Sequence, residues 1–166
     1  MMTADWVRMM ARYTQWQNGA IFGAANALPE AELARDRGAF FGSIEGTMNH
    51  LLWGDRMWMS RFAGTPGPKA SGIAASVGEE ADWPSLLFAR ADVDRAILDW
   101  AGTLDDATLA GDLTWFSGAA GREVTRPLAL CITHFFNHGT HHRGQVHAML
   151  TAAGVRTEDT DLFMMP

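Results

Sequence analysis

The stretch "HFFNHGTHHRGQVHAML", residues 134–150, says most about how this chain folds. Apolar side chains recur in it at steps of three and four, which is the pattern of an amphipathic helix packed against a core. On such a helix His134, His138 and His142 lie one turn apart and form a single stripe. The stretch therefore predicts a long helix that carries both core residues and a row of imidazoles.

The same periodicity appears in three other segments of the chain. Thr3 or Asp5 can cap the first helix, Asp82 can cap the third, and Gly154 can end the last. Four long helices joined by loops favour an all-α four-helix bundle, formed by a single domain over residues 1–166. The predicted helices run from Thr3 to Ala27, from Phe41 to Phe62, from Asp82 to Thr103, and from just after Thr125 to Ala153.

Between the third and fourth predicted helices lies the strand-like stretch "LTWFSGAAGREVTR", residues 113–126. Two short segments flank a glycine-rich turn, so the residues fit either a small hairpin or an irregular lid over one end of the bundle. Trp115 in this stretch is the side chain that we expect to lie over a functional site.

Composition excludes several classes of partner. The formal net charge is −6 and no cluster of Lys and Arg offsets it, which argues against binding of nucleic acid. No apolar run approaches the roughly 18 residues of a membrane span, so we expect no membrane association. The N-terminal residues, interrupted by Asp5, Arg8 and Arg12, do not resemble a secretory signal. Because Cys131 is the sole cysteine, no intramolecular disulfide can form, and we expect a reducing, cytoplasmic location.

The histidines are the residues that most strongly indicate a functional site. Two imidazoles four residues apart on a helix can converge on one metal ion, and a third ligand must come from elsewhere. His50, in an apolar part of the predicted second helix, is the one histidine outside the C-terminal helix. It is either that third ligand or a core histidine held by hydrogen bonds. His141 lies at the edge of the stripe, and His147 falls on the opposite side of the helix, where surface exposure or packing is expected.

Several neighbours of the histidines allow two interpretations. His134 either lines a pocket or packs in the core, and we favour the pocket. Asp55 and Glu45 lie five residues from His50 on either side, and neither points naturally at that ring. An ion pair between helices, such as Asp55 with Arg143, is the favoured role for these acids.

Cys131 and two glycines of the last helix are expected to serve packing. Cys131 faces the same way as His138, but a lone cysteine between leucines is more typical of a core than of a nucleophile. Gly139 and Gly144 each cost helix stability, about 1 kcal/mol relative to alanine. We expect them to permit close approach of a neighbouring helix.

The stretch "HGTHHRGQVHAML" resembles the signature of the DinB/YfiT-like superfamily of metalloenzymes, whose last helix carries His-x-x-x-His-Arg-Gly-Gln. The resemblance covers nearly the whole chain. "YTQWQNGAIFGAANALPEAEL" is similar to the first helix of that family, and "FFGSIEGTMNHLLWGDRMWMSRF" is similar to its second. The terminal "TDLFMMP" is similar to its closing segment.

The resemblance implies a bundle of up-down-down-up order that is frequently a homodimer. It also implies that His50, His138 and His142 are the metal ligands, and that the divalent ion is zinc or nickel. Relatives in the superfamily include transferases and isomerases that use low-molecular-weight thiols such as mycothiol, bacillithiol or glutathione.

Three neutral nitrogen ligands with no fourth protein ligand describe an open metal site. An ion there can activate water for hydrolysis, or hold a thiol as thiolate for S-transfer or isomerisation. We therefore expect a metal-dependent thiol S-transferase or isomerase that acts on a small electrophile, with a low-molecular-weight thiol as cosubstrate. The alternative is a non-catalytic stress-response dimer that binds a metal or a small molecule. Hydrolysis is less favoured because the ligand face lacks an obvious carboxylate base.

Overall fold

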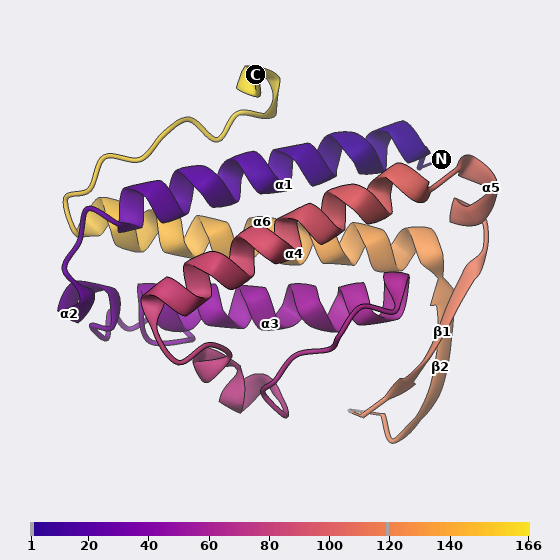
Figure 1. Cartoon of the computed structure of the whole chain (residues 1–166), viewed down its shortest axis with the longest axis horizontal. Helices are drawn as coiled ribbons and strands as arrows, with labels where there is room; N and C mark the ends of the chain where they lie inside the picture. The colour runs from indigo at the N-terminus through magenta and orange to yellow at the C-terminus, as the bar shows by residue number, and fades with distance from the viewer. Residues whose placement is uncertain (1, 119) are drawn as a thin grey trace.

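Four long helices form the body of the protein in this computed structural model, which describes residues 2–118 and 120–166. Helix α1 packs against α4 and α6, and α3 packs against the same two helices. Figure 1 shows α1 and α6 running in one direction and α3 and α4 in the other. The four helices are α1 (Ala4–Ala25), α3 (Ile44–Ala63), α4 (Trp83–Thr103) and α6 (Leu128–Ala152).

A two-stranded antiparallel sheet makes the prediction of an all-α fold wrong in part. Strand β1 pairs with β2 so that Asp112 lies opposite Pro127 and Ser117 lies opposite Arg122. Of the two alternatives for this stretch, the hairpin is the one observed. The chain is thus mostly helical with a small sheet between α5 and α6. The short elements are α2 (Glu30–Leu33), η1 (Ile73–Gly78), α5 (Asp106–Leu109), β1 (Asp112–Ser117), β2 (Arg122–Pro127) and η2 (Leu162–Met164).

Helix ends follow local chemistry. Thr3 and Asp82 cap α1 and α4 by accepting hydrogen bonds from backbone N–H groups three residues on, as predicted. Gly154 follows α6 with φ +80°, a left-handed conformation that suits glycine. Helix α3 begins later than predicted because Ser43 caps it. Phe41 is therefore outside the helix and free to lie against its side.

The core consists of two clusters of buried side chains along the four helices. One contains Cys131, which is 3% exposed, in agreement with its interpretation as a core residue. The other lies at the end of the molecule where α3 begins and α6 ends, and includes Ile44 and Leu150. No helix in the described part of the chain is both long and apolar enough to span a bilayer.

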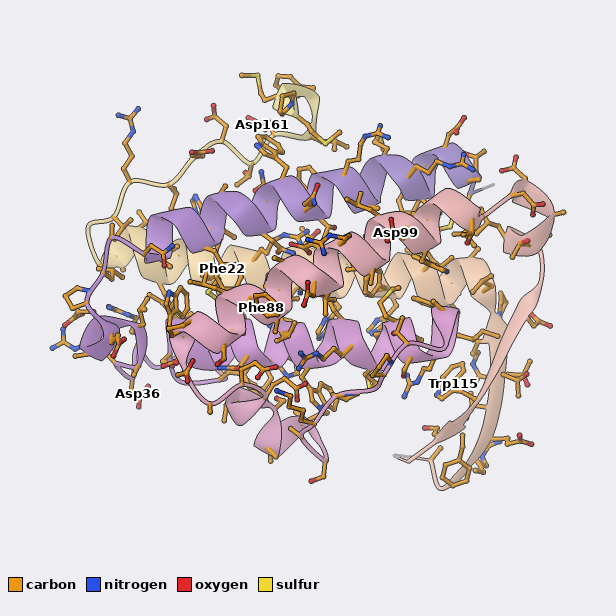
Figure 2. All side chains as sticks on the ribbon, in the orientation of Figure 1. Phe22, Asp36, Phe88, Asp99, Trp115 and Asp161 are labelled. Carbon is orange, nitrogen blue, oxygen red and sulfur yellow. The ribbon has the colours of Figure 1, made fainter. Side chains whose placement is uncertain are left out.

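The C-terminal segment returns along α1 after α6 ends. The Tyr13 hydroxyl donates a hydrogen bond to the carbonyl of Thr160, and the Gln17 amide donates one to that of Asp159. Figure 2 shows Asp161 on this segment, beside α1 and away from the hairpin that carries Trp115. The segment thus lies along α1 (Figure 1) and contacts it at Tyr13 and Gln17.

Candidate metal centre

Three histidines from two helices meet inside the protein. His50 comes from α3, and His138 and His142 come from α6. One nitrogen of each ring lies within 4.8 Å of the other two, and the Nε2 atoms of His50 and His138 are 3.2 Å apart. Metal–nitrogen bonds of about 2.0–2.1 Å at tetrahedral angles place two nitrogens roughly 3.3 Å apart. The spacing therefore suits one ion bound between the rings.

A hydrogen bond to Ser76 sets the tautomer of His50. The Ser76 hydroxyl lies 2.6 Å from the carbonyl oxygen of Ile73, which can only accept, so the hydroxyl proton points there. Nδ1 of His50 is 2.8 Å from the same hydroxyl oxygen and must donate to it. The proton of His50 is thus on Nδ1, and Nε2 presents a lone pair to the other two histidines.

Gln145 sets the tautomer of His142 in a similar way. The side-chain carbonyl of Gln145 is 2.8 Å from Nδ1 of His142, so that nitrogen donates. The amide group of Gln145 is in turn 3.2 Å from Nε2 of His141 and donates to it. His142 therefore also keeps the lone pair of Nε2 free. Such partners raise the basicity of ligating histidines and fix their orientation.

Burial keeps the three rings neutral. Desolvation, with a smaller effect of His142, lowers the pKa of His50 to about 4. Desolvation and the neighbouring histidines, His142 first among them, lower the pKa of His138 to about 3. The pKa of His142 is also lowered, mainly by burial. All three rings therefore hold lone pairs at neutral pH, which is the state that binds a metal ion.

Two residues, one before α3 and one within it, shape the space around the histidine rings. The ring of Phe41 stacks on the ring of His50 with centroids 3.7 Å apart. Gly54, one turn after His50, faces the ring of His138 with no side chain between them. The absence of a Cβ atom at Gly54 lets His138 approach the backbone of α3.

The loop that carries Ser76 is anchored by buried acids. Glu79 accepts hydrogen bonds from the backbone N–H groups of Lys69 and Ala70 and forms an ion pair with Arg56. The backbone N–H of Glu80 donates to the side-chain carbonyl of Asn49 on α3. These contacts hold the loop against α3 and so fix the position of the Ser76 hydroxyl.

The three histidines lie on the wall of a cavity of about 920 Å³. His134 and Trp115, the two predicted pocket residues, line the same cavity. Figure 2 shows Trp115 projecting from the hairpin towards the end of α3. Its ring meets that of Trp58 edge to face, with centroids 5.7 Å apart, and Trp58 in turn meets His134 at 5.3 Å. Among the described residues that line the cavity there is no aspartate or glutamate.

Asp55 forms an ion pair between helices, as predicted, but Arg143 as its partner is wrong. Asp55 instead accepts a hydrogen bond from Arg90 of α4 at 2.6 Å, and Arg90 also pairs with Asp94. Arg143 lies over the ring of Tyr13 on α1, 5.9 Å from its centroid. Asp55 faces α4 because α3 packs against α4 as well as α6, a choice that the spacing from His50 does not reveal.

Several other expectations concern residues away from the centre. Glu45 lines a separate hollow together with Asp82, and His147 bonds to the Thr157 hydroxyl at 2.7 Å. A Cβ atom on Gly144 would meet nothing within 4 Å, so the expected close approach of a helix there is wrong. On Gly139 it would meet the side chain of Arg143, which belongs to the same helix.

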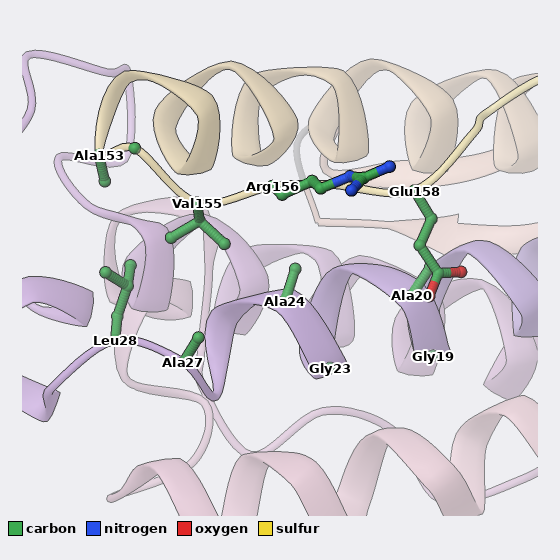
Figure 3. Close-up of a pocket in the computed structure, with 11 residues that line it drawn as sticks. Gly19, Ala20, Gly23, Ala24, Ala27, Leu28, Ala153, Val155, Arg156 and Glu158 are labelled. Carbon is green, nitrogen blue, oxygen red and sulfur yellow. The ribbon is translucent and has the colours of Figure 1, made fainter.

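A second hollow, of about 660 Å³, separates α1 from the segment after α6. Figure 3 shows small residues of α1, such as Gly23 and Ala24, facing Val155, Arg156 and Glu158. Its lining contains no histidine or cysteine among the described residues. The hollow therefore offers no second set of ligands for a soft or borderline metal ion.

Comparison with known proteins shows the family of this chain. The family model described as "DinB family" matches residues 1–166. The chain belongs to the DinB family. A curated relative of this DinB-family chain, Protein DinB of Bacillus subtilis (strain 168), is 25% identical over 163 residues, covering 95% of the chain and 92% of the relative.

A solved structure shows the same fold. The crystal structure of a DinB-like protein from Bacillus cereus ATCC 10987 superposes with a TM-score of 0.65, covering 95% of this chain and 97% of that one. The sequences are 15% identical, so this likeness concerns the fold alone. The resemblance of the quoted motifs to the DinB/YfiT-like superfamily is thus confirmed at the level of the family.

Several residues of the centre were missed by sequence reasoning, and they differ in how well the sequence signals them. Gln145 lies three residues after His142, so helical spacing alone could have paired them. Gly54 lies four residues after His50 inside an amphipathic helix, which is also a detectable signal. Ser76 and Phe41 lie outside the long helices, and no local pattern points to them.

Proposed function

We propose that this DinB-family protein binds one divalent ion through His50, His138 and His142 and uses it on a small molecule bound in the adjacent cavity. One observation carries the proposal: three neutral imidazoles, with outer nitrogens held by Ser76 and Gln145, converge on the wall of a large cavity. Structural zinc sites are closed by four protein ligands, whereas three ligands beside a cavity leave a position for a ligand from solution.

Zinc or nickel is the proposed ion, because both accept imidazole nitrogens and the resemblance to the DinB/YfiT-like superfamily implies one of the two. The three rings have borderline character, and the described lining of the cavity lacks the carboxylates that magnesium or calcium require. The ion identity is measurable by elemental analysis of the purified protein.

The proposed reaction class is thiol-dependent transfer or isomerisation on a small electrophile. A bound divalent ion supplies a positive charge that keeps a thiol ligand deprotonated near neutral pH. The protein contributes apolar walls, including Trp53 and Trp115, on one side of the cavity. His134, whose pKa is lowered by burial and by Arg61, is neutral and can accept the proton that the thiol releases.

Turnover assays test this proposal. The protein, loaded with zinc or nickel, is mixed with glutathione, bacillithiol or mycothiol and the electrophile 1-chloro-2,4-dinitrobenzene. We expect thioether formation that requires both metal and thiol and that disappears in the His138→Ala/His142→Ala variant. One bound ion per chain without turnover for any thiol would favour a non-catalytic metal-binding protein. Consumption of an activated ester by the metal-loaded protein without added thiol would favour hydrolysis as the reaction.

A further inference from the structure

Arg61 lies in the same cavity as the three histidines but in a distinct part of it. It follows His50 by eleven residues on α3. Its guanidinium carbon is 4.7 Å from the ring centre of Trp58 and 5.2 Å from that of Trp115. Guanidinium groups are attracted to the faces of aromatic rings. Two tryptophans from different elements thus hold this cation on the cavity wall.

No acid in the described part of the chain neutralises Arg61. Half-buried Arg56 and buried Arg90 form ion pairs with Glu79 and Asp55, whereas Arg61 forms none with the described residues. Burial lowers the pKa of Arg61, but the ordinary pKa of arginine is so high that the group stays charged at neutral pH. A half-buried cation without a counter-ion favours binding of an anion from solution.

The walls between Arg61 and the histidines are apolar. Trp53, Met57 and Trp58 line this part of the cavity. Trp58 follows His50 by eight residues, which corresponds to roughly 12 Å along the helix axis. A small molecule that reaches from the guanidinium to the histidines would therefore need an anionic end, an apolar body and a reactive end roughly 12 Å away.

We propose that Arg61 binds the carboxylate of a small acid whose apolar body lies against Trp58 and Trp115. The guanidinium presents two parallel N–H donors that match the two oxygens of a carboxylate. The inference extends the proposed function by naming the class of small molecule, and it rests on that function for the placement of the opposite end at the histidines. Binding of the carboxylate itself requires no metal ion.

A matched pair of probes tests the inference. Calorimetry compares the dissociation constants of 4-phenylbutyrate and its uncharged analogue 4-phenylbutan-1-ol. In the unmodified protein we expect the acid to bind at least about tenfold more tightly than the alcohol, the range for a charge-assisted hydrogen bond. Arg61→Gln should bring this ratio close to one. Arg95→Gln, which changes an exposed arginine of α4 far from the cavity, should leave the ratio unchanged.

Two further variants separate this inference from the metal proposal. Arg61→Lys keeps the charge but loses the two-pronged geometry, so the ratio should fall at least about threefold even if Arg61→Gln does not fold. In His138→Ala/His142→Ala the preference for the acid should persist. A preference that survives in both Arg61 variants and disappears in the double histidine variant would place the carboxylate at the histidines and overturn the inference. Failure of both probes to bind at millimolar concentration would also overturn it, whereas loss of metal from the double variant bears only on the proposed function.

Discussion

A Cβ atom placed on Gly54 would lie 2.8 Å from Cε1 of His138, closer than real Cβ contacts allow. Helix α3 thus supplies one ligand through His50 and, one turn later, the space for a ligand from α6. Because Gly54 has no side chain, the His138 ring of α6 fits against α3 at this point.

Gly54→Ala is therefore expected to displace the ring of His138 and weaken metal binding. Overpacking of this kind costs about 1–3 kcal/mol. Metal affinity by competition with a chelating dye and the melting temperature should both fall. Gly144→Ala on α6 is the matched control, because its Cβ meets nothing within 4 Å and alanine favours a helix by up to about 1 kcal/mol. Equal behaviour of the two variants would remove the structural role assigned to Gly54.

Ser76→Ala removes the acceptor that holds the Nδ1 proton of His50. Loss of such a partner typically reduces metal affinity by roughly 10- to 100-fold. We expect that reduction for zinc, with little change in the fold as measured by circular dichroism. Ser71→Ala, which changes another serine of the cavity lining, should bind zinc like the parent. An unchanged affinity in Ser76→Ala would show that the hydrogen bond does not orient His50.

Metal-free protein should lose stability as the pH falls from about 6.5 towards 4. The folded-state pKa values of His50 and His138 lie near 4 and 3, below the ordinary value for an unfolded chain, so the unfolded state binds more protons in this window. The free energy of unfolding must then decrease as protons are added. Chemical denaturation at a series of pH values measures the slope. It should be shallower in His50→Gln/His138→Gln, and an identical slope would contradict neutral burial of these rings.

Asp55→Asn leaves the buried guanidinium of Arg90 without one of its two acidic partners. Breaking a buried ion pair by removal of one partner costs about 3–5 kcal/mol. Urea unfolding should show a loss in that range, while Asp92→Asn, in an exposed pair with Arg95, should cost under about 1 kcal/mol. A small effect at Asp55 would mean that water or Asp94 compensates fully for the lost charge.

Helical periodicity was sufficient for the parts of this molecule that depend on one element at a time. The spacing of His138 and His142 places both on one face of α6, and Thr3, Asp82 and Gly154 mark helix ends that the structure reproduces. The hairpin stayed ambiguous because its strands are short and its turn rich in glycine.

Helical periodicity does not predict which residues of different elements contact one another. Asp55 pairs with Arg90 instead of Arg143 because the rotation of α3 relative to α4 depends on core packing. Ser76 and Arg61 acquire their roles only when a loop and a hairpin fold against α3. Gly54 and Gln145 were signalled by their spacing from His50 and His142, although only the structure shows what each contacts.

The metal content of histidine variants tests the central claim most directly. Elemental analysis after loading with zinc or nickel and desalting should give one ion per chain for the parent protein and for His147→Ala. His50→Ala and the double variant His138→Ala/His142→Ala should retain almost none. A double variant that carries as much metal as the parent protein would contradict the account.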